Sequence, residues 1–186
     1  GDNDAPTTET ITLKAIAEDS GVLIITQADL LATANDVDNA NLNATNLAIS
    51  SGNGTLVDNG NGTWSYTPAS NDDTSVSFSY TISDGDKTVA GSATLDITPV
   101  NDAPVTTPVI LAAIAEDSGT RLITQTDLLA NASDPVEHDA LVATNLVITS
   151  GKGTLVDNHN GTWTYTPASN DDTSVSFSYK ITDNGT

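Results

Sequence analysis

The stretch YTPASNDDTSVSFSY occupies residues 66–80 and recurs, letter for letter, at residues 165–179. Near its end Val76, Phe78 and Tyr80 alternate with serine, so that every second side chain is apolar. This period of two is typical of a β-strand that turns one face to a core and the other to water. The recurrence indicates two tandem copies of one β-rich unit.

The repeat extends beyond this stretch. AIAEDSG occurs at residues 15–21 and again at 113–119, and NDAP occurs at 3–6 and at 101–104. The spacing is 98 residues for these motifs and 99 for the longer stretch, which places a one-residue insertion near residues 132–141. Each copy has the size of a small independent domain. We therefore expect two domains, residues 1–100 and residues 101–186.

The remaining pattern predicts an all-β fold. GTLVDNGNGTWSYTP at 54–68 predicts a hairpin whose Asn-Gly pairs supply the positive φ of the turn, with Trp64 and Tyr66 on its core side. Further strands are expected at residues 11–15, 22–25, 46–49 and 88–98, and a helical turn at 27–34. About seven short strands in each copy predict two tandem Greek-key β-sandwiches.

The second copy lacks a counterpart of the last predicted strand. TVAGSATLDIT at 88–98 is not repeated after ITDNG at 181–185. Either the sequence stops short of that strand, or another chain supplies it by strand addition.

Composition limits the possible functions. The chain has 25 acidic and 5 basic residues, giving a formal net charge of −20, and it has no cysteine. Nucleic acids and anionic lipid surfaces require a basic surface, so binding to either is not expected. Disulfides, thiol chemistry and cysteine-based zinc sites are excluded. No apolar run has the 18 or so residues that span a bilayer.

The acidic residues lie between the predicted strands. Loops of a β-sandwich gather at its two ends. Counting strand reversals places the turns near residues 18–20 and 71–73 at one end, and those near 36–39 and 84–86 at the other. A solvated surface alone would also account for the acidity, because a high net charge keeps a protein dispersed.

A shared cation accounts for the positions of these acids as well as their number. If two units stack end to end, acidic loops of one meet acidic loops of the next, and a divalent cation converts their repulsion into attraction. Ca²⁺ takes six to eight oxygen ligands from carboxylates, amides and carbonyls, which matches this set better than Mg²⁺ does. The predicted ligands at the junction are Glu18, Asp72, Asp73, Asn101, Asp102, Asp134, Glu137, Asp139 and Asp183. Those of a second site at the amino end are Asn3, Asp4, Asp36, Asp38 and Asp84.

The motifs AED, DVD, NDD, SDG and NDAP, in that order, resemble the calcium motifs of cadherin repeats. The nearer resemblance is to the bacterial cadherin-like repeats of giant RTX-type surface adhesins. It implies a cadherin/immunoglobulin-like sandwich, and it matches Glu18 to the early glutamate and Asn71-Asp72-Asp73 to the Asp-Arg-Glu motif. It further matches Asn101 and Asp102 to the linker, Asp134 and Glu137 to the Asp-x-Asp pair, and Asp183 to the late aspartate. Pro99 and Ala103 depart from the linker pattern, which implies fewer ions per junction than the three of animal cadherins.

The expected function is that of an extracellular extender module, stiffened by Ca²⁺, in a bacterial cell-surface adhesin. Its partners would be neighbouring repeats of the same polypeptide, with a surface or glycan bound through other domains, and the fragment itself would be monomeric. The alternative is a repeat that binds a glycan, or another copy of itself, directly. An enzyme is not expected, because no nucleophile–base constellation is evident and neither His138 nor His159 has a counterpart in the first copy.

Overall fold

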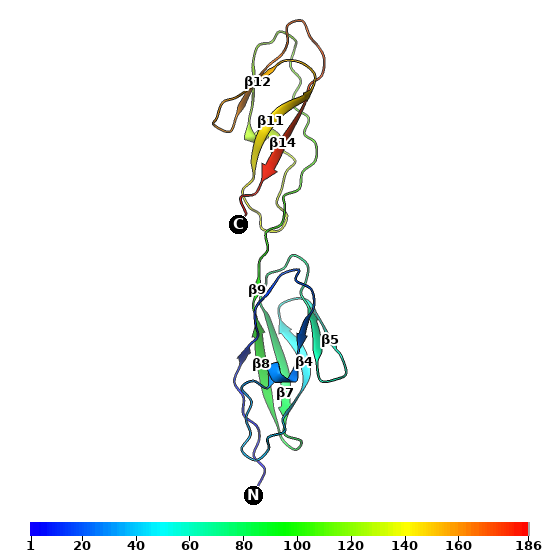
Figure 1. Ribbon diagram of the computed structural model, residues 1–186, viewed down its shortest axis with the longest axis vertical. Coiled ribbons are helices and arrows are strands. Elements are labelled where there is room, and N and C mark those ends of the chain that lie inside the picture. The colour runs from blue at the N-terminus through cyan, green and yellow to red at the C-terminus, as the bar shows by residue number, and fades with distance from the viewer. Residues whose placement is uncertain (186) are drawn as a thin grey trace. The chain divides into compact units, whose positions relative to one another are not determined.

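The computed structural model describes residues 1–185 and consists almost entirely of β-strands joined by turns (Figure 1). It divides into two compact units, Gly1–Val100 and Asn101–Thr186, called here unit 1 and unit 2. Each unit has its own hydrophobic core. The predicted all-β sandwich class is confirmed. In the described part of the chain, no helix has the length and apolar character needed to cross a bilayer.

Unit 1 is built on two sheets. Its strands are β1 (Ile11–Thr12), β2 (Ile16–Ala17), β3 (Leu23–Ile25), β4 (Asn43–Ser51), β5 (Thr55–Asp58), β6 (Trp64–Thr67), β7 (Val76–Ser83), β8 (Thr88–Leu95) and β9 (Ile97–Thr98). One sheet has the order β1-β8-β7-β4 and the other β3-β6-β5, while β2 pairs with β9. Figure 1 shows β4, β7 and β8 side by side. β1 and β2 run parallel to their partners, and the other pairs are antiparallel.

Unit 2 repeats part of this arrangement. Its elements are β10 (Arg121–Ile123), α2 (Gln125–Leu128), β11 (Val142–Ser150), β12 (Thr154–Asp157), β13 (Trp163–Thr166) and β14 (Ser176–Thr182). The sheets are β10-β13-β12 and β11-β14. Within residues 101–185, no strand takes the position of β1, β2, β8 or β9. Where about seven strands were predicted in each copy, unit 1 has nine, of which β1, β2 and β9 are only two residues long, and the described part of unit 2 has five.

Several boundaries differ from the predicted ones: the strand predicted at 11–15 is only Ile11–Thr12 (β1), and the one predicted at 46–49 extends over Asn43–Ser51 (β4). The strand predicted at 88–98 is interrupted at Asp96, because the pairing of β8 with β7 stops where β7 begins, at the pair Val76–Leu95. Beyond that point β2 is the partner, and the Ile16 N–H donates to the Asp96 carbonyl at 3.1 Å. The helical turn predicted at 27–34 is shorter, α1 (Gln27–Leu30), capped by Thr26.

The two cores show why the strands alternate. Val76, Phe78, Tyr80 and Ile82 are all buried, as the period of two predicts. The ring of Phe78 packs edge to face on Tyr66 with centroids 5.4 Å apart. Unit 2 repeats this contact between the copies of these rings, at 5.5 Å. The edge-to-face contact adds to the stabilisation gained by burying each ring.

Both tryptophans are core residues. Trp64 and Trp163 are each 4% exposed, and Trp64 lies on the same side of its strand as the buried Tyr66. The predicted core positions are confirmed. Neither indole ring is therefore available as a surface platform for stacking a sugar.

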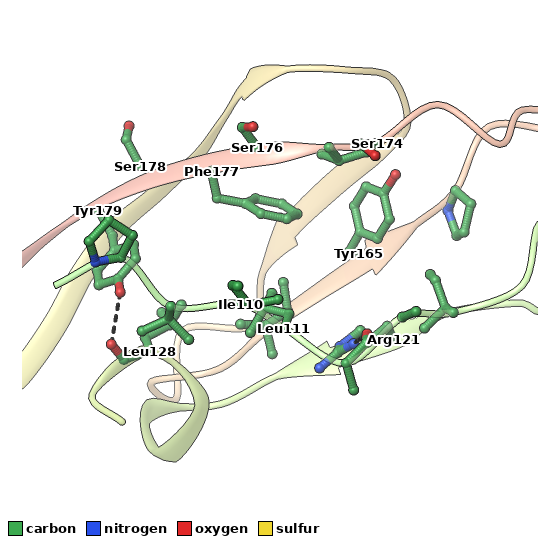
Figure 2. Close-up of a pocket in the computed structure, with 18 of the residues that line it drawn as sticks. Ile110, Leu111, Arg121, Leu128, Tyr165, Ser174, Ser176, Phe177, Ser178 and Tyr179 are labelled. Atoms are coloured by element: carbon green, nitrogen blue, oxygen red, sulfur yellow. Dashed lines mark hydrogen bonds between the residues drawn. The ribbon is translucent and has the colours of Figure 1, made fainter. Parts of the chain in front are cut away.

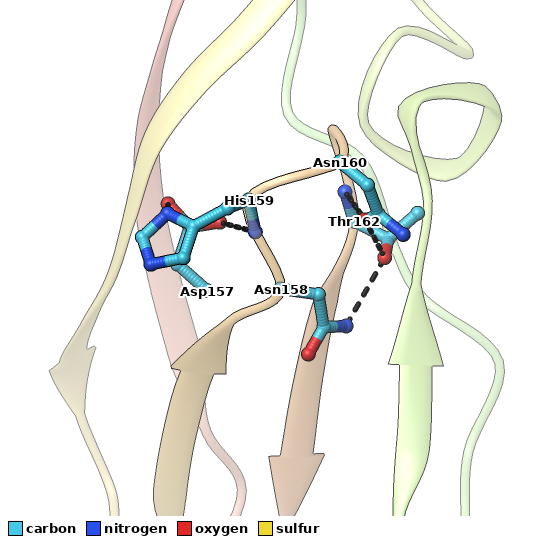
Figure 3. Close-up of polar contacts among 5 residues, drawn as sticks. All are labelled: Asp157, Asn158, His159, Asn160 and Thr162. Atoms are coloured by element: carbon cyan, nitrogen blue, oxygen red, sulfur yellow. Dashed lines mark hydrogen bonds and ion pairs between the residues drawn. The ribbon is translucent and has the colours of Figure 1, made fainter.

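The hairpin turn between β12 and β13 is held by short polar side chains (Figure 3). The Asn158 side-chain amide donates to the Thr162 hydroxyl at 3.1 Å, and that hydroxyl donates to Asn160 at 2.6 Å. His159 takes a positive φ of 57°, and its N–H donates to Asp157 at 2.8 Å. The His159 side chain is 88% exposed, so this histidine is part of the turn.

Gly91 tests the packing of β8 on β7. A Cβ at residue 91 would lie 2.3 Å from Cε2 of Tyr80, whose hydroxyl is anchored on the Leu30 carbonyl. Gly91→Ala is expected to lower the free energy of unfolding of unit 1 by about 1–3 kcal/mol, the usual cost of overpacking. Urea denaturation followed by Trp64 fluorescence, in a Trp163→Phe background, measures it.

Ala90→Ser is the matched control for Gly91→Ala, because residue 90 is exposed on the same strand. It should change stability by no more than about 0.5 kcal/mol. Equal effects of the two substitutions would contradict the packing described for Gly91.

Candidate metal centre

Five of the predicted ligands form a cluster at the amino-terminal end of unit 1. The Asn3 side-chain amide donates to Asp84 Oδ2 at 2.9 Å, and the Asp4 N–H donates to Asp38 Oδ2 at 2.8 Å. The Asp38 N–H in turn donates to Asp36 Oδ1 at 2.7 Å. Asn3, Asp4, Asp36, Asp38 and Asp84 are called here cluster 1.

Unit 2 builds the same arrangement from the corresponding residues. The Asn101 side-chain amide donates to Asp183 Oδ2 at 3.0 Å, and the Asp102 N–H donates to Glu137 Oε2 at 3.1 Å. The Glu137 N–H donates to Asp134 Oδ1 at 3.1 Å. Asn101, Asp102, Asp134, Glu137 and Asp183 are called cluster 2. The side chain at 137 is one methylene longer than the aspartate at 38, yet it accepts the equivalent bond.

Asp36 and Asp134 hold their loops with one carboxylate oxygen each. Oδ1 of Asp36 accepts the N–H groups of Asp38 and Asn39, and Oδ1 of Asp134 accepts those of Val136 and Glu137. Short acidic side chains commonly bond the backbone two residues on in this way. In both loops the second oxygen, Oδ2, takes no part in the turn.

Three buried side-chain oxygens in the described residues have no hydrogen-bond partner: Asp36 Oδ2, Asp134 Oδ2 and Glu137 Oε1. All three belong to cluster 1 or cluster 2. Asp134 is only 6% exposed, so little water reaches its carboxylate. A buried oxygen without a donor costs the full desolvation of that group, and more for a charged one. These oxygens fit a hard cation, which would satisfy them.

Neither cluster is a complete metal shell on its own. Across residues 1–185, no group of three or more aspartate, glutamate or histidine side chains is arranged to hold a metal ion. Ca²⁺ also takes amide, backbone carbonyl and water oxygens, so a shell of six to eight need not consist of carboxylates alone. The remaining oxygens would have to come from such groups or from outside the cluster.

The acids at the other end of unit 1 make different contacts. Glu18 is 3% exposed, and its Oε1 accepts the Val100 N–H at 2.7 Å. Asp19 Oδ1 accepts the Asn71 N–H at 3.2 Å, which confirms that the two turns predicted for this end lie together. Asp72 accepts the Thr74 N–H at 2.9 Å.

Asp73 and Asp139 are exposed. Asp73 follows Asp72 in its turn, and Asp139 lies in the loop of Asp134 and Glu137. Of all the predicted ligands, Asp73 and Asp139 therefore have the least support from the structure.

Sequence reasoning missed two residues that support the clusters. The Asn39 side-chain amide donates to the Asp84 carbonyl at 2.7 Å, and this contact joins the two loops predicted for this end. His138 has a φ of 61° and places Nδ1 3.0 Å from the Asp134 carbonyl oxygen. Asn39 directly follows the DVD motif of residues 36–38, so the sequence could have indicated it as a member of the cluster. No local pattern in the sequence indicates the contact made by His138.

Hydrogen bonds keep the late aspartate of each cluster ionised. The backbone N–H groups of Asp86 and Lys87, followed by Asn3, lower the pKa of Asp84. The Gly185 N–H, followed by the Asn101 amide, lowers the pKa of Asp183. Donors that bond the charged form of a carboxyl always act in this direction.

A family model described as a cadherin-like domain matches residues 2–98 and, again, residues 100–186. The chain belongs to the cadherin-like domain family. The two cadherin-like matches together cover nearly the whole chain, one for each copy of the repeat. No curated protein sequence matches the chain significantly.

The solved structures that resemble this chain share little of its sequence. The ectodomain of human Desmocollin-1 is 10% identical, with a TM-score of 0.44, over 99% of this chain and 35% of that one. The endo-fucoidan hydrolase MfFcnA4 from glycoside hydrolase family 107 is 19% identical, with a TM-score of 0.36, over 95% of this chain and 28% of that one. The SGBP-B protein of Bacteroides ovatus, in complex with a mixed-linkage heptasaccharide, is 12% identical, with a TM-score of 0.34, over 97% and 44%. This cadherin-like chain thus spans less than half of each, and the TM-scores are too low to indicate its function.

Asn101 tests the architecture of cluster 2. Asn101→Ala removes the donor to Asp183 Oδ2 and is expected to raise the pKa of Asp183 toward its unfolded value of about 3.9. The folded pKa lies below the unfolded one, so the stabilisation is present above the unfolded pKa and is lost as pH falls through the folded pKa. The variant should lose less stability over that acid range. Carboxyl NMR titration in chelator measures the pKa.

Asn158→Ala is the control for this titration, because Asn158 lies in the hairpin turn and bonds Thr162. It should leave the pKa of Asp183 in place. An Asp183 pKa that is unchanged in Asn101→Ala would contradict the cluster.

Proposed function

We propose that this chain is a pair of calcium-binding extender modules from a large bacterial cell-surface adhesin of the RTX type. One observation carries the proposal: all three buried oxygens without a partner, within residues 1–185, belong to the two clusters. The cadherin-like family supports a role in adhesion or as a spacer. Calcium, the bacterial surface and the extracellular location are part of the proposal.

Electrostatics supports a divalent cation at these clusters. The chain carries a net charge of −20, and like charges 4 Å apart repel by about 1 kcal/mol in water and about 4 kcal/mol near a protein surface. Between such carboxylates Ca²⁺ replaces repulsion with attraction. Of the common hard cations it tolerates irregular sets of oxygens best, whereas Mg²⁺ demands near-ideal octahedral geometry.

The contacts of the linker support a stiffening role. Val100 is bound by Glu18 in unit 1, and the next residue, Asn101, is bound by Asp183 in unit 2. A single peptide bond therefore separates two anchored residues. As predicted from the order of the motifs, Glu18, Asp72 and Asp73 are proposed to supply further oxygen ligands to an ion bound at cluster 2.

The proposed mechanism is ligand-linked stability. An ion that binds only the ordered form stabilises it by about 2.7 kcal/mol when its concentration is one hundred times Kd. Extracellular calcium modules have Kd values of about 10⁻⁴–10⁻³ M. The junction between such modules would be flexible where calcium is scarce and rigid where calcium is abundant.

Asp134→Asn tests calcium binding at cluster 2. The asparagine keeps an Oδ1 that can accept the loop N–H groups of Val136 and Glu137, but it loses the charge on the oxygen that has no partner. The variant should weaken calcium binding at this cluster by roughly tenfold or more, because a charged ligand is replaced by a neutral one. Calorimetric titration with CaCl₂ measures the affinity, and Asp157→Asn, in the hairpin turn, should bind like the wild type. A wild type that gives no calcium isotherm would overturn the proposal.

Small-angle X-ray scattering tests the stiffening role separately. Excess chelator should shorten the largest dimension of the wild type by allowing the two units to reorient. Asp134→Asn should give the same curve with calcium at a concentration that saturates the wild type as with chelator. A wild-type curve that does not change on adding chelator would leave calcium binding intact but contradict the extender role.

A further inference from the structure

The hairpin turn of each unit contains the sequence Asn-Gly-Thr, at residues 61–63 and 160–162. In both copies the asparagine is exposed, and the strand that follows carries aromatic side chains into the core. Tyr165 of β13 packs edge to face on Phe177 at 5.5 Å, and Figure 2 shows both rings at the groove that they line in unit 2. The turn is therefore open to solvent but anchored by the strand that leaves it.

The side-chain carbonyl of this asparagine accepts two hydrogen bonds from the threonine. Asn61 Oδ1 accepts the Thr63 N–H at 3.1 Å and the Thr63 hydroxyl at 2.7 Å. Asn160 Oδ1 accepts the same two donors of Thr162, at 3.1 Å and 2.6 Å (Figure 3). Donors placed on a carbonyl oxygen stabilise the negative charge that develops there when a nucleophile attacks the carbon. Both side-chain amides are therefore activated toward attack at Cγ.

A second asparagine orients the threonine hydroxyl. The Asn59 side-chain amide donates to Thr63 Oγ1 at 3.0 Å, and that of Asn158 donates to Thr162 Oγ1 at 3.1 Å. Because a lone pair of the hydroxyl is occupied by this bond, its proton is free to point to the next oxygen, Oδ1 of Asn61 in unit 1. Successive hydrogen bonds of this kind strengthen one another.

The nucleophile within reach is the backbone nitrogen of the glycine that follows. Attack of this nitrogen on Cγ closes a succinimide ring, and such an intramolecular step needs no encounter between molecules. Glycine has no side chain to obstruct the attack. Among the described residues, the N–H groups of Gly62 and Gly161 have no hydrogen-bond acceptor, so no bond has to be broken before the nitrogen reacts.

Asn59 also precedes a glycine, but its surroundings oppose the same reaction. The Gly60 N–H donates to Asp58 Oδ1 at 2.8 Å. The neighbouring carboxylate disfavours the negative charge that this nitrogen acquires when its proton is lost. The side-chain nitrogen and oxygen of Asn59 are also both engaged, by Thr63 and by Ser65. One hairpin thus holds two Asn-Gly pairs, and only the second is arranged for ring closure.

We propose that Asn61 and Asn160 are self-modification sites, at which the folded turn promotes deamidation of the side chain. The glycine nitrogen gives its proton to hydroxide and forms a bond to Cγ, while Oδ1 takes the negative charge between the two threonine donors. The bond from Cγ to the side-chain nitrogen then breaks, and ammonia leaves. Water opens the succinimide at either of its carbonyls, to aspartate or isoaspartate. Water is the co-reactant, and nothing is oxidised or reduced.

Each event changes the turn in a defined way. Either product adds one negative charge to a chain whose formal net charge is −20. Isoaspartate also adds a methylene to the backbone of the hairpin. Neither asparagine belongs to cluster 1 or cluster 2, so the modification does not depend on the calcium proposal.

Peptide mapping by mass spectrometry, on the full chain incubated at mildly alkaline pH, measures the modification at each asparagine. Asn61 and Asn160 should react at least about tenfold faster than Asn59. A synthetic peptide of residues 57–64, VDNGNGTW, gives the reference for sequence alone, and its two Asn-Gly pairs should react at similar rates. The same ratio of Asn61 to Asn59 in the folded chain as in the peptide would overturn the inference.

Thr63→Val tests the role of the hydroxyl. It keeps the backbone N–H and the shape of the side chain but removes one donor to Asn61 Oδ1, and it should slow the reaction of Asn61 roughly tenfold. Thr63→Ser should restore the rate. Asn160, in the same molecule, is the matched control and should react as in the wild type. An unchanged rate at Asn61, or an equal fall at both asparagines, would refute a local role of the threonine.

Discussion

The structure depends most on carboxylates that the fold holds close together without giving every oxygen a donor. In each unit one oxygen of an aspartate, Asp36 or Asp134, organises a loop, and the other is buried without a partner. This is an unfavourable arrangement for a protein in plain water, and it occurs twice at corresponding positions. Random surface acidity would place such oxygens in solvent. The proposed cation would remove this cost, and stability would then depend on that cation.

The repeat provides a comparison within one molecule. Units 1 and 2 share a 15-residue stretch without change, so differences between them come from what surrounds it. Phe78 is covered by β8, whereas Phe177 borders a groove. Glu18 is buried against Val100, whereas its copy Glu116 is exposed. Both differences follow from the strand present in unit 1 and not found in the described part of unit 2.

Local pattern predicted most of the fold, because alternation in one strand is independent of its partners. It could not predict the break at Asp96, which depends on where β7 begins, nor the absence of strands at 109–115, which depends on a missing partner. Counting strand reversals predicted that the turns near residues 36–39 and 84–86 lie at the same end of unit 1, and the contact between Asn39 and Asp84 confirms it. The support from His138 was not predictable, because it depends on a positive φ in the longer loop of unit 2. The metal itself stays a prediction, since a sequence places oxygens in loops but does not show which cation they select.

The most direct measurement is an anomalous difference map from crystals grown in excess Ca²⁺. The account predicts a calcium peak at cluster 2, with Asp134 Oδ2 and Glu137 Oε1 about 2.3–2.6 Å from the ion. A map in which those two oxygens are satisfied by water or by a side-chain donor, with no anomalous peak beside Asp102, would contradict it.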